Sequence, residues 1–281
     1  MRWSSRGTSS DIEDTRGRGP SRGVMIGGGG GIVALLLALI FGPGVLNGGG
    51  GAPAPVNGPN GQEYQPSPEE QKMVEFVSFV LDDIQTTWDS EFPKQGGSYR
   101  HAKLVLFTGE TQSACGAGEA AMGPFYCPAD EKAYIDLSFY QVMKDRLGAP
   151  GDFAQAYVIA HELGHHVQNL RGISEKEARA MQANPGKANE ISVRQELQAD
   201  CLAGVWAFSA NKRGVLEGGD WEEGMVAANA IGDDTLQKNA GGRVVPESFT
   251  HGTSEQRKKW FRRGFQSGSE AECDTYSANP L

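Results

Sequence analysis

The chain has 281 residues, of which 38% are hydrophobic and 22% are charged, and its formal net charge at pH 7 is −9. This composition suits a globular protein, and it excludes nucleic-acid binding, which would call for a basic stripe. Of the 39 glycines, 16 lie within residues 17–61, so that part of the chain is not expected to form a packed core.

An uncharged segment extends from Gly23 to Leu46 and contains the run GIVALLLALIFGPGVL. Because a helix needs about 20 mostly apolar residues to span a bilayer, residues 23–46 are predicted to form a transmembrane anchor. Residues 1–22 carry five arginines against three acidic residues. The positive-inside rule therefore predicts a single-pass membrane protein, in which residues 1–22 form a cytoplasmic tail and the rest of the chain is exported.

The alternative for this segment is a cleaved signal peptide. APA at residues 52–54 is a possible cleavage site, but Pro55 follows it directly and the basic region is long for a signal. Both interpretations place the remaining chain outside the cytoplasm.

Residues 47–66 are rich in Gly, Pro and Asn and are predicted to form a flexible linker. Order begins at Ser67, which can cap a helix that has Pro68 at its first position and Glu70 completing a capping box. Apolar residues then recur at helical spacing up to Ile84. Residues 67–281 are therefore predicted to form one domain that begins with an amphipathic helix.

Two strands and several helices are predicted after this first helix. AKLVLFT (102–108) has the pattern of a buried strand, and KAYIDLSF (132–139) that of a half-buried one. Helices follow at residues 137–148, 153–170, 174–183, 189–212, 220–238 and 254–266. The predicted fold is α+β, with a small N-terminal sheet over a mostly helical core.

Four cysteines follow the predicted anchor, namely Cys115, Cys127, Cys201 and Cys273. An even number in an exported domain favours disulfides, for which three pairings are possible. A metal site would need CxxC-like spacing, which is absent. A bridge between Cys115 and Cys127 would close a short loop, and that leaves Cys201 to pair with Cys273.

The sequence HELGHH contains His161, Glu162 and His165. On a helix the two histidines lie one turn apart on one face, where both can bind one tetrahedral ion, while Glu162 points toward a water molecule on that ion. An exposed polar helix face is the alternative. The apolar residues AYVIA just before His161 instead indicate a buried helix, in which His and Glu side chains need partners.

A third ligand is needed for zinc. Metzincins would place a glycine at 168 and a histidine at 171, where this chain has Gln168 and Arg171. A glutamate from a later helix is the other solution, and Glu196 in RQELQADCLAGVWAF can supply it. Asp200 lies one turn further on the same face, where it can accept the second N–H of a ligand histidine. Glu190 is an alternative third ligand, without such a companion.

HELGHH together with ELQAD resembles the gluzincin metalloproteases. Four ordered blocks resemble the putative neutral zinc metallopeptidase family of bacterial membrane-anchored proteins, across about residues 70–270: ACGAGEAAMGPFYCPADEKAYIDLSF, VIAHELGHHVQNLRG, QELQADCLAGVWA and FTHGTSEQRKKWFRRGFQSG. The resemblance implies a zincin-like domain with a peptidase site.

THGTSEQR places His251 just before a helix that Thr253 and Gln256 can cap as a capping box. The segment is similar to the T-H-P-x-x-x-x-R segment of membrane gluzincins such as the CAAX prenyl proteases, with Arg257 at the matching offset and Gly252 in place of the proline. The resemblance implies that His251 donates a hydrogen bond in the transition state. The alternative is a loop histidine bonded to backbone groups.

The sequence thus predicts a peptidase that binds Zn²⁺ through His161, His165 and Glu196 and uses Glu162 as general base. Its partner would be a peptide or protein, which could add as a strand along residues 114–127. Two alternatives remain: a zinc-dependent hydrolase of a non-peptide envelope bond, and a non-catalytic envelope scaffold with structural zinc. The sequence does not define an oligomeric state.

Overall fold

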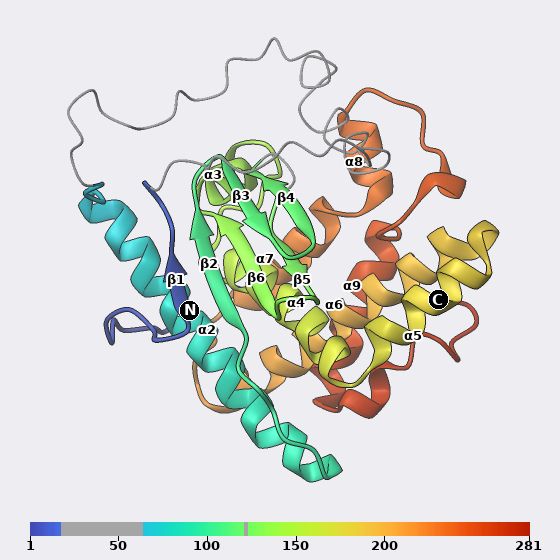
Figure 1. Cartoon of the computed structure of the whole chain (residues 1–281), viewed down its shortest axis with the longest axis horizontal. Coiled ribbons are helices and arrows are strands. Elements are labelled where there is room, and N and C mark those ends of the chain that lie inside the picture. Colours follow the sequence, from blue (N-terminus) through green and yellow to red (C-terminus); the bar gives the residue numbers. More distant parts are fainter. Residues whose placement is uncertain (18–63, 121–122) are drawn as a thin grey trace.

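The computed structural model describes residues 1–17, 64–120 and 123–281 (Figure 1). The predicted anchor at residues 23–46 and most of the predicted linker at 47–66 lie outside these ranges. Within the described ranges, no helix combines the length and apolar character that a membrane crossing requires.

A mixed four-stranded sheet forms the N-terminal part of the fold. Its strands lie in the order β1 (Ile12–Asp14), β2 (Lys103–Phe107), β6 (Lys132–Asp136) and β5 (Phe125–Cys127). The first three are parallel, and β5 runs antiparallel to β6 at the edge. A separate antiparallel pair consists of β3 (Glu110–Ser113) and β4 (Gly116–Glu119).

The helices fill the rest of the molecule (Figure 1). They are α2 (Pro68–Glu91), α3 (Ser138–Asp145), α4 (Asp152–Leu170), α5 (Ile173–Ala183), α6 (Ala188–Lys212), α7 (Asp220–Ala230), α8 (Asp233–Asn239) and α9 (Ser254–Ser267). Leu104 and Ile135 on one face of the sheet join the main hydrophobic core, which also contains Trp88, Tyr157 and Trp206 from the helices. The fold is therefore α+β and mostly helical, with a small N-terminal mixed sheet.

Both predicted capping boxes are present. Ser67 accepts a hydrogen bond from the Glu70 amide and donates its own amide to the Glu70 carboxylate. Thr253 and Gln256 make the same pair of bonds at the start of α9. These local side-chain bonds set where the two helices begin.

The single helix predicted at 220–238 is wrong, because α7 ends at Ala230 and α8 begins at Asp233. Gly232 between them is extended, and a Cβ atom there would lie 2.4 Å from the Ser254 amide nitrogen. The break also turns the Asp233 carboxylate toward the loop before α9, where it accepts the His251 amide at 2.7 Å. Tertiary contacts thus override the helical pattern.

Residues 1–17, which belong to the predicted tail, pair with the sheet of the domain. Strand β1 pairs in parallel with β2, with Glu13 opposite Val105. The Leu104 amide donates to the Asp11 carbonyl, and the Thr15 amide donates to the Leu106 carbonyl. β1 consists of IED, which has one strongly apolar residue, so no hydrophobic alternation announces this strand. We call residues 1–17 the head.

Both predicted disulfides are present. Cys115 joins Cys127 with a sequence separation of 12 residues, and this bridge ties the segment after β3 to β5. Cys201 joins Cys273 with a separation of 72 residues, and this bridge ties α6 to the segment after α9. Disulfides are typical of proteins outside the cytoplasm, so they indicate an extracytoplasmic domain.

Candidate metal centre

The structure brings His161 and His165 of α4 together with Glu196 of α6, and their ligand atoms all lie within 4.8 Å of one another. Nε2 of His161 is 3.1 Å from Oε2 of Glu196, and Nε2 of His165 is 3.5 Å from Oε1 of the same carboxylate. Two imidazole nitrogens and one carboxylate oxygen form the donor set of many catalytic zinc sites. The residues present therefore fit a zinc ion.

Close packing of α4 on α6 makes this arrangement possible. A Cβ atom on Gly164 would lie 2.9 Å from the Ala199 carbonyl oxygen, which is tighter than side-chain contacts normally allow. Gly164 stands between the two histidines on α4, and Ala199 lies three residues after Glu196 on α6. The glycine of HELGHH thus lets the two helices approach closely enough for ligands from both to meet.

The Nδ1 atoms of both histidines are engaged by other side chains. Nδ1 of His161 is 2.9 Å from Oδ1 of Asp200, as predicted for a carboxylate that orients a ligand. Nδ1 of His165 is 2.8 Å from Oε1 of Gln168, which sequence reasoning used only to exclude metzincins. The position of Gln168 three residues after His165 could have revealed it. These bonds leave each Nε2 atom facing Glu196.

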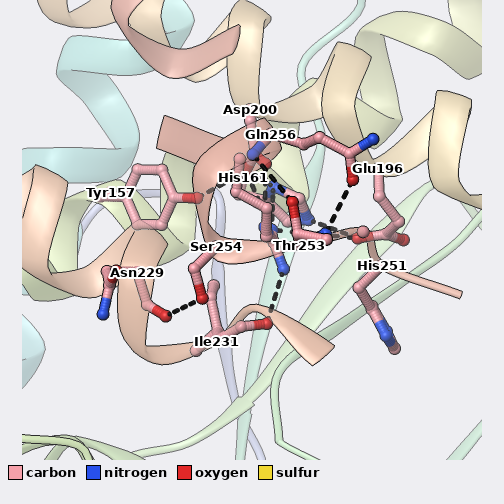
Figure 2. Close-up of polar contacts among 12 residues, drawn as sticks. Tyr157, His161, Glu196, Asp200, Asn229, Ile231, His251, Thr253, Ser254 and Gln256 are labelled. Atoms are coloured by element: carbon pink, nitrogen blue, oxygen red, sulfur yellow. Dashed lines mark hydrogen bonds and ion pairs between the residues drawn. The ribbon is translucent and has the colours of Figure 1, made fainter. Parts of the chain in front are cut away.

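Asp200 is a fully buried carboxylate with several donors around it (Figure 2). Arg257 donates from Nε to Oδ2 at 2.8 Å and from Nη2 to Oδ1 at 2.9 Å, and the Tyr157 hydroxyl also donates to Oδ1. Burial raises the pKa of Asp200, but Arg257 and the hydrogen bond with His161 lower it by more. Asp200 therefore stays ionised, and the ionised carboxylate holds the imidazole of His161.

A cavity of about 550 Å³ lies beside the centre and includes Glu162, His165 and Glu196 in its lining. Its other walls are largely apolar and include Phe125, Phe139, Val142, Val158, Met181 and Leu236. Glu162 is half-buried, and burial raises its pKa more than the neighbouring histidines lower it. The predicted general base and the candidate metal ligands therefore share one cavity large enough for part of a peptide.

The third histidine of HELGHH, His166, has a structural position away from this cavity. It is fully buried, with Nε2 donating to the Arg100 carbonyl at 2.6 Å and Nδ1 2.9 Å from the Tyr126 hydroxyl. Asn169 donates to the same hydroxyl at 3.1 Å. These bonds hold edge strand β5 against α4, and residues 123–126 of this segment line the cavity.

His251 also lines the cavity, and its side chain is 34% exposed. Its Nδ1 atom is 3.1 Å from Oδ1 of Asp233, and its amide donates to Oδ2 of the same residue. Burial lowers the pKa of His251, but Glu196 and Asp233 raise it by more. The loop is thus held by bonds to Asp233 while His251 lies in the cavity lining, and its role as a transition-state donor stays a prediction.

Glu190, the alternative third ligand, does not reach the centre. It is exposed and binds Arg194 one turn further along α6, with Nη2 to Oε1 at 3.0 Å. The group of candidate ligands around His161 and His165 contains Glu196 and not Glu190.

Glu177 on α5 was missed by sequence reasoning. Its side chain lines the cavity and is 4% exposed, and neither carboxylate oxygen has a hydrogen-bond partner among the described residues. Burial, with a smaller contribution from Glu196, raises its pKa to about 8. The surrounding sequence SEKEAR is typical of an exposed helix face, so no local pattern announces a buried acid.

Comparison with known proteins gives one family and several relatives. The family described as "Putative neutral zinc metallopeptidase" matches residues 1–276. The chain is 51% identical over 290 residues to the uncharacterized protein YpfJ of Escherichia coli K12, covering 98% of this chain and 99% of that protein. It is 43% identical over 209 residues to the uncharacterized protein Rv2575 of Mycobacterium tuberculosis, covering 70% and 69% respectively. No solved structure matches significantly.

Proposed function

The chain belongs to the putative neutral zinc metallopeptidase family, and on this premise we propose that it is a zinc-dependent peptidase that hydrolyses peptide bonds outside the cytoplasm. One observation carries the proposal. The donor atoms of His161, His165 and Glu196 lie within 4.8 Å of one another, and Glu162 lines the same cavity. A structural zinc site has a closed fourth position and no use for such a base.

The chemistry follows from the residues in the cavity. Zinc, when bound by His161, His165 and Glu196, supplies Lewis-acid chemistry and acidifies a water molecule. Glu162 takes the proton of the attacking water on its carboxylate and later delivers it to the leaving amine. The pKa of Glu162 is raised from its ordinary value in the direction of neutral pH, which suits a group that both accepts and donates a proton. Asp200 keeps the imidazole of His161 in one orientation throughout.

The substrate position follows from the sheet. Of the predicted strand-addition segment at 114–127, β4 pairs with β3, whereas β5 pairs with β6 and forms an edge of the sheet among the described residues. Residues 123–126 line the cavity. A peptide that adds to the β5 edge would therefore run past the metal ligands, with a side chain facing the apolar wall.

His251 completes the proposed site as a hydrogen-bond donor to the oxyanion. Asp233 accepts from its amide and lies 3.1 Å from its Nδ1 atom, so both the loop and the ring are held from one side. The other ring nitrogen, Nε2, is then the donor for the substrate. This role rests on its place in the cavity lining and on preorganised donors being effective at such positions.

A substrate panel tests the proposal. Purified full-length protein is incubated with a peptide library and with peptidoglycan fragments, alongside the Glu162→Gln variant. We expect cleavage of peptides by the wild type and none by the variant. Cleavage confined to peptidoglycan amide bonds would indicate a non-peptide hydrolase. Zinc-loaded protein that cuts neither substrate would indicate a scaffold.

A further inference from the structure

The head, residues 1–17, is bonded into the domain by a buried carboxylate. Asp11 is 9% exposed. It accepts from Gln85 Nε2 at 2.8 Å and from Lys103 Nζ at 2.7 Å, and it lies 2.8 Å from Nδ1 of His101. Burial raises the pKa of Asp11, but Lys103 and His101 lower it by more. The domain thus supplies three partners to one buried charge of the head, at the same place where β1 pairs with β2.

The head also contributes to the main hydrophobic core. Met1 is 8% exposed and belongs to this core, and the ring of Trp3 packs edge-on against Phe76 of α2, with centroids 5.3 Å apart. The amino group of Met1 is 2.9 Å from Asp152, the first residue of helix α4, which carries two of the candidate metal ligands, and 3.3 Å from Asp220. The head is therefore part of the same folded unit as the candidate metal centre.

The two ends of the segment at 18–63 meet on the surface of this unit. The guanidinium of Arg16 lies 5.4 Å from the centre of the Tyr64 ring and 3.9 Å from the Glu70 carboxylate. A Cβ atom on Gly17 would lie 2.1 Å from Cβ of Tyr64. The chain therefore leaves the described structure at Gly17 and re-enters it at Tyr64 beside the same point.

These contacts conflict with a single membrane crossing between the head and the domain. A hydrocarbon core about 30 Å thick cannot separate two paired strands of one sheet. A single crossing would place β1 and β2 on opposite sides of the membrane. The β1–β2 pairing would then be lost, and the domain residues that bind Asp11 would lose their partner.

We propose that the head and residues 64–281 lie in the same compartment. If the apolar residues 23–46 enter a lipid bilayer, the chain therefore enters and leaves it from the same side. This replaces the single-pass topology that the arginines of residues 1–22 suggested.

Two matched serine-to-cysteine variants of the full chain test the proposal. Ser5 lies in the head and Ser90 lies on α2, and both are exposed. All four native cysteines are in disulfides, so each introduced thiol is unique. A membrane-impermeant maleimide is applied to spheroplasts of a bacterial host that produces Ser5→Cys or Ser90→Cys, and then to the same spheroplasts after permeabilisation.

We expect the two positions to react alike. Labelling of both before permeabilisation supports the proposal and also the proposed export of the domain. Labelling of both only after permeabilisation supports the proposal but contradicts export. If one position is labelled and the other is protected until permeabilisation, the proposal is overturned.

Hydrogen exchange on the membrane-bound full-length protein is the second measurement. The amides of Leu104 and Thr15 donate to carbonyls across the β1–β2 pair, so both should exchange slowly when the head is docked. Exchange of both amides at the rate of an unfolded peptide, while α4 stays protected, would show that the head is undocked in the membrane and would reject the proposal.

Discussion

Oδ1 of Asp200 lies 2.9 Å from Nδ1 of His161, and the same carboxylate receives two hydrogen bonds from Arg257. The three residues come from α6, α4 and α9, so one buried ion pair connects the helices that build the centre. Because Nδ1 is engaged, the Nε2 atom of His161 is directed toward Glu196. The geometry of the candidate ligands therefore depends on a residue, Arg257, that is not itself a ligand.

Zinc content should separate the ligand role from the base role. The wild type should bind about one zinc ion per chain. Glu196→Ala should lose zinc, whereas Glu162→Gln should retain zinc and lose peptidase activity, as measured by elemental analysis and peptide cleavage. Glu190→Ala is the matched control and should behave like the wild type. Loss of zinc from the Glu190 variant with full zinc in the Glu196 variant would mean that the third ligand is wrongly assigned.

The hydrogen bonds behind the ligands should tune metal affinity. Asp200→Asn and Gln168→Ala remove the partners of the two Nδ1 atoms, and each should weaken zinc binding by about 10- to 100-fold. Competition with a fluorescent chelator measures the effect. Gln71→Ala is a control, because Gln71 is an exposed residue of α2. Unchanged affinity in both test variants would show that these bonds do not orient the ligands.

Removal of Arg257 alone should destabilise the fold more than removal of Arg257 together with the charge of Asp200, its ion-pair partner. Arg257→Met leaves Asp200 buried without its ion-pair partner, at a cost of about 3–5 kcal/mol of unfolding free energy. In the double variant with Asp200→Asn, part of that stability should return, because no uncompensated charge remains. Urea unfolding measures both. A double variant less stable than Arg257→Met would contradict this account.

Glu177 should make the protein less stable as the pH rises. The folded chain keeps the carboxyl protonated up to its raised pKa of about 8, whereas the unfolded chain releases this proton above the ordinary value of 4.5. Stability is therefore lost between these two pH values, since the unfolded state is favoured by proton release. Glu177→Gln should raise Tm relative to the wild type at pH 8.5 but change it little at pH 4.5.

The control for this prediction is Glu175→Gln on the same helix. Glu175 is exposed, so its replacement should leave Tm nearly unchanged at both pH values. A Tm difference between Glu177→Gln and the wild type that is the same at pH 4.5 and pH 8.5 would rule out titration of a buried carboxyl.

His251→Ala should lower kcat by about a hundredfold or more, the usual loss for one oxyanion donor. KM should change little, because the bond strengthens mainly in the transition state. Zinc content and Tm should stay near those of the wild type. His166→Ala is a useful contrast, since loss of its buried bonds to Tyr126 and Arg100 should lower Tm. An unaltered kcat would leave His251 as a residue that only secures its loop.

The sequence predicts those features of the fold and the candidate site that depend on residues close together in the chain. The spacing of His161 and His165, the capping boxes at Ser67 and Thr253, and most helices follow from interactions within a few residues, where the helical period is itself the geometry. The choice of Glu196 as candidate third ligand was also available from sequence, because Asp200, the partner of the His161 Nδ1 atom, lies one turn away on the same helix.

Only the tertiary structure decided the features that join distant segments. β1 exists because the edge of β2 accepts it, the α7–α8 break exists because Asp233 binds the loop at His251, and Glu177 is buried because α5 folds over the cavity. No local pattern encodes these, since each partner lies far away in the chain. The sequence by itself determined which residues could hold a metal; the close contact at Gly164 and the ion pair of Arg257 with Asp200 decided that they meet, because only packing brings α4, α6 and α9 together.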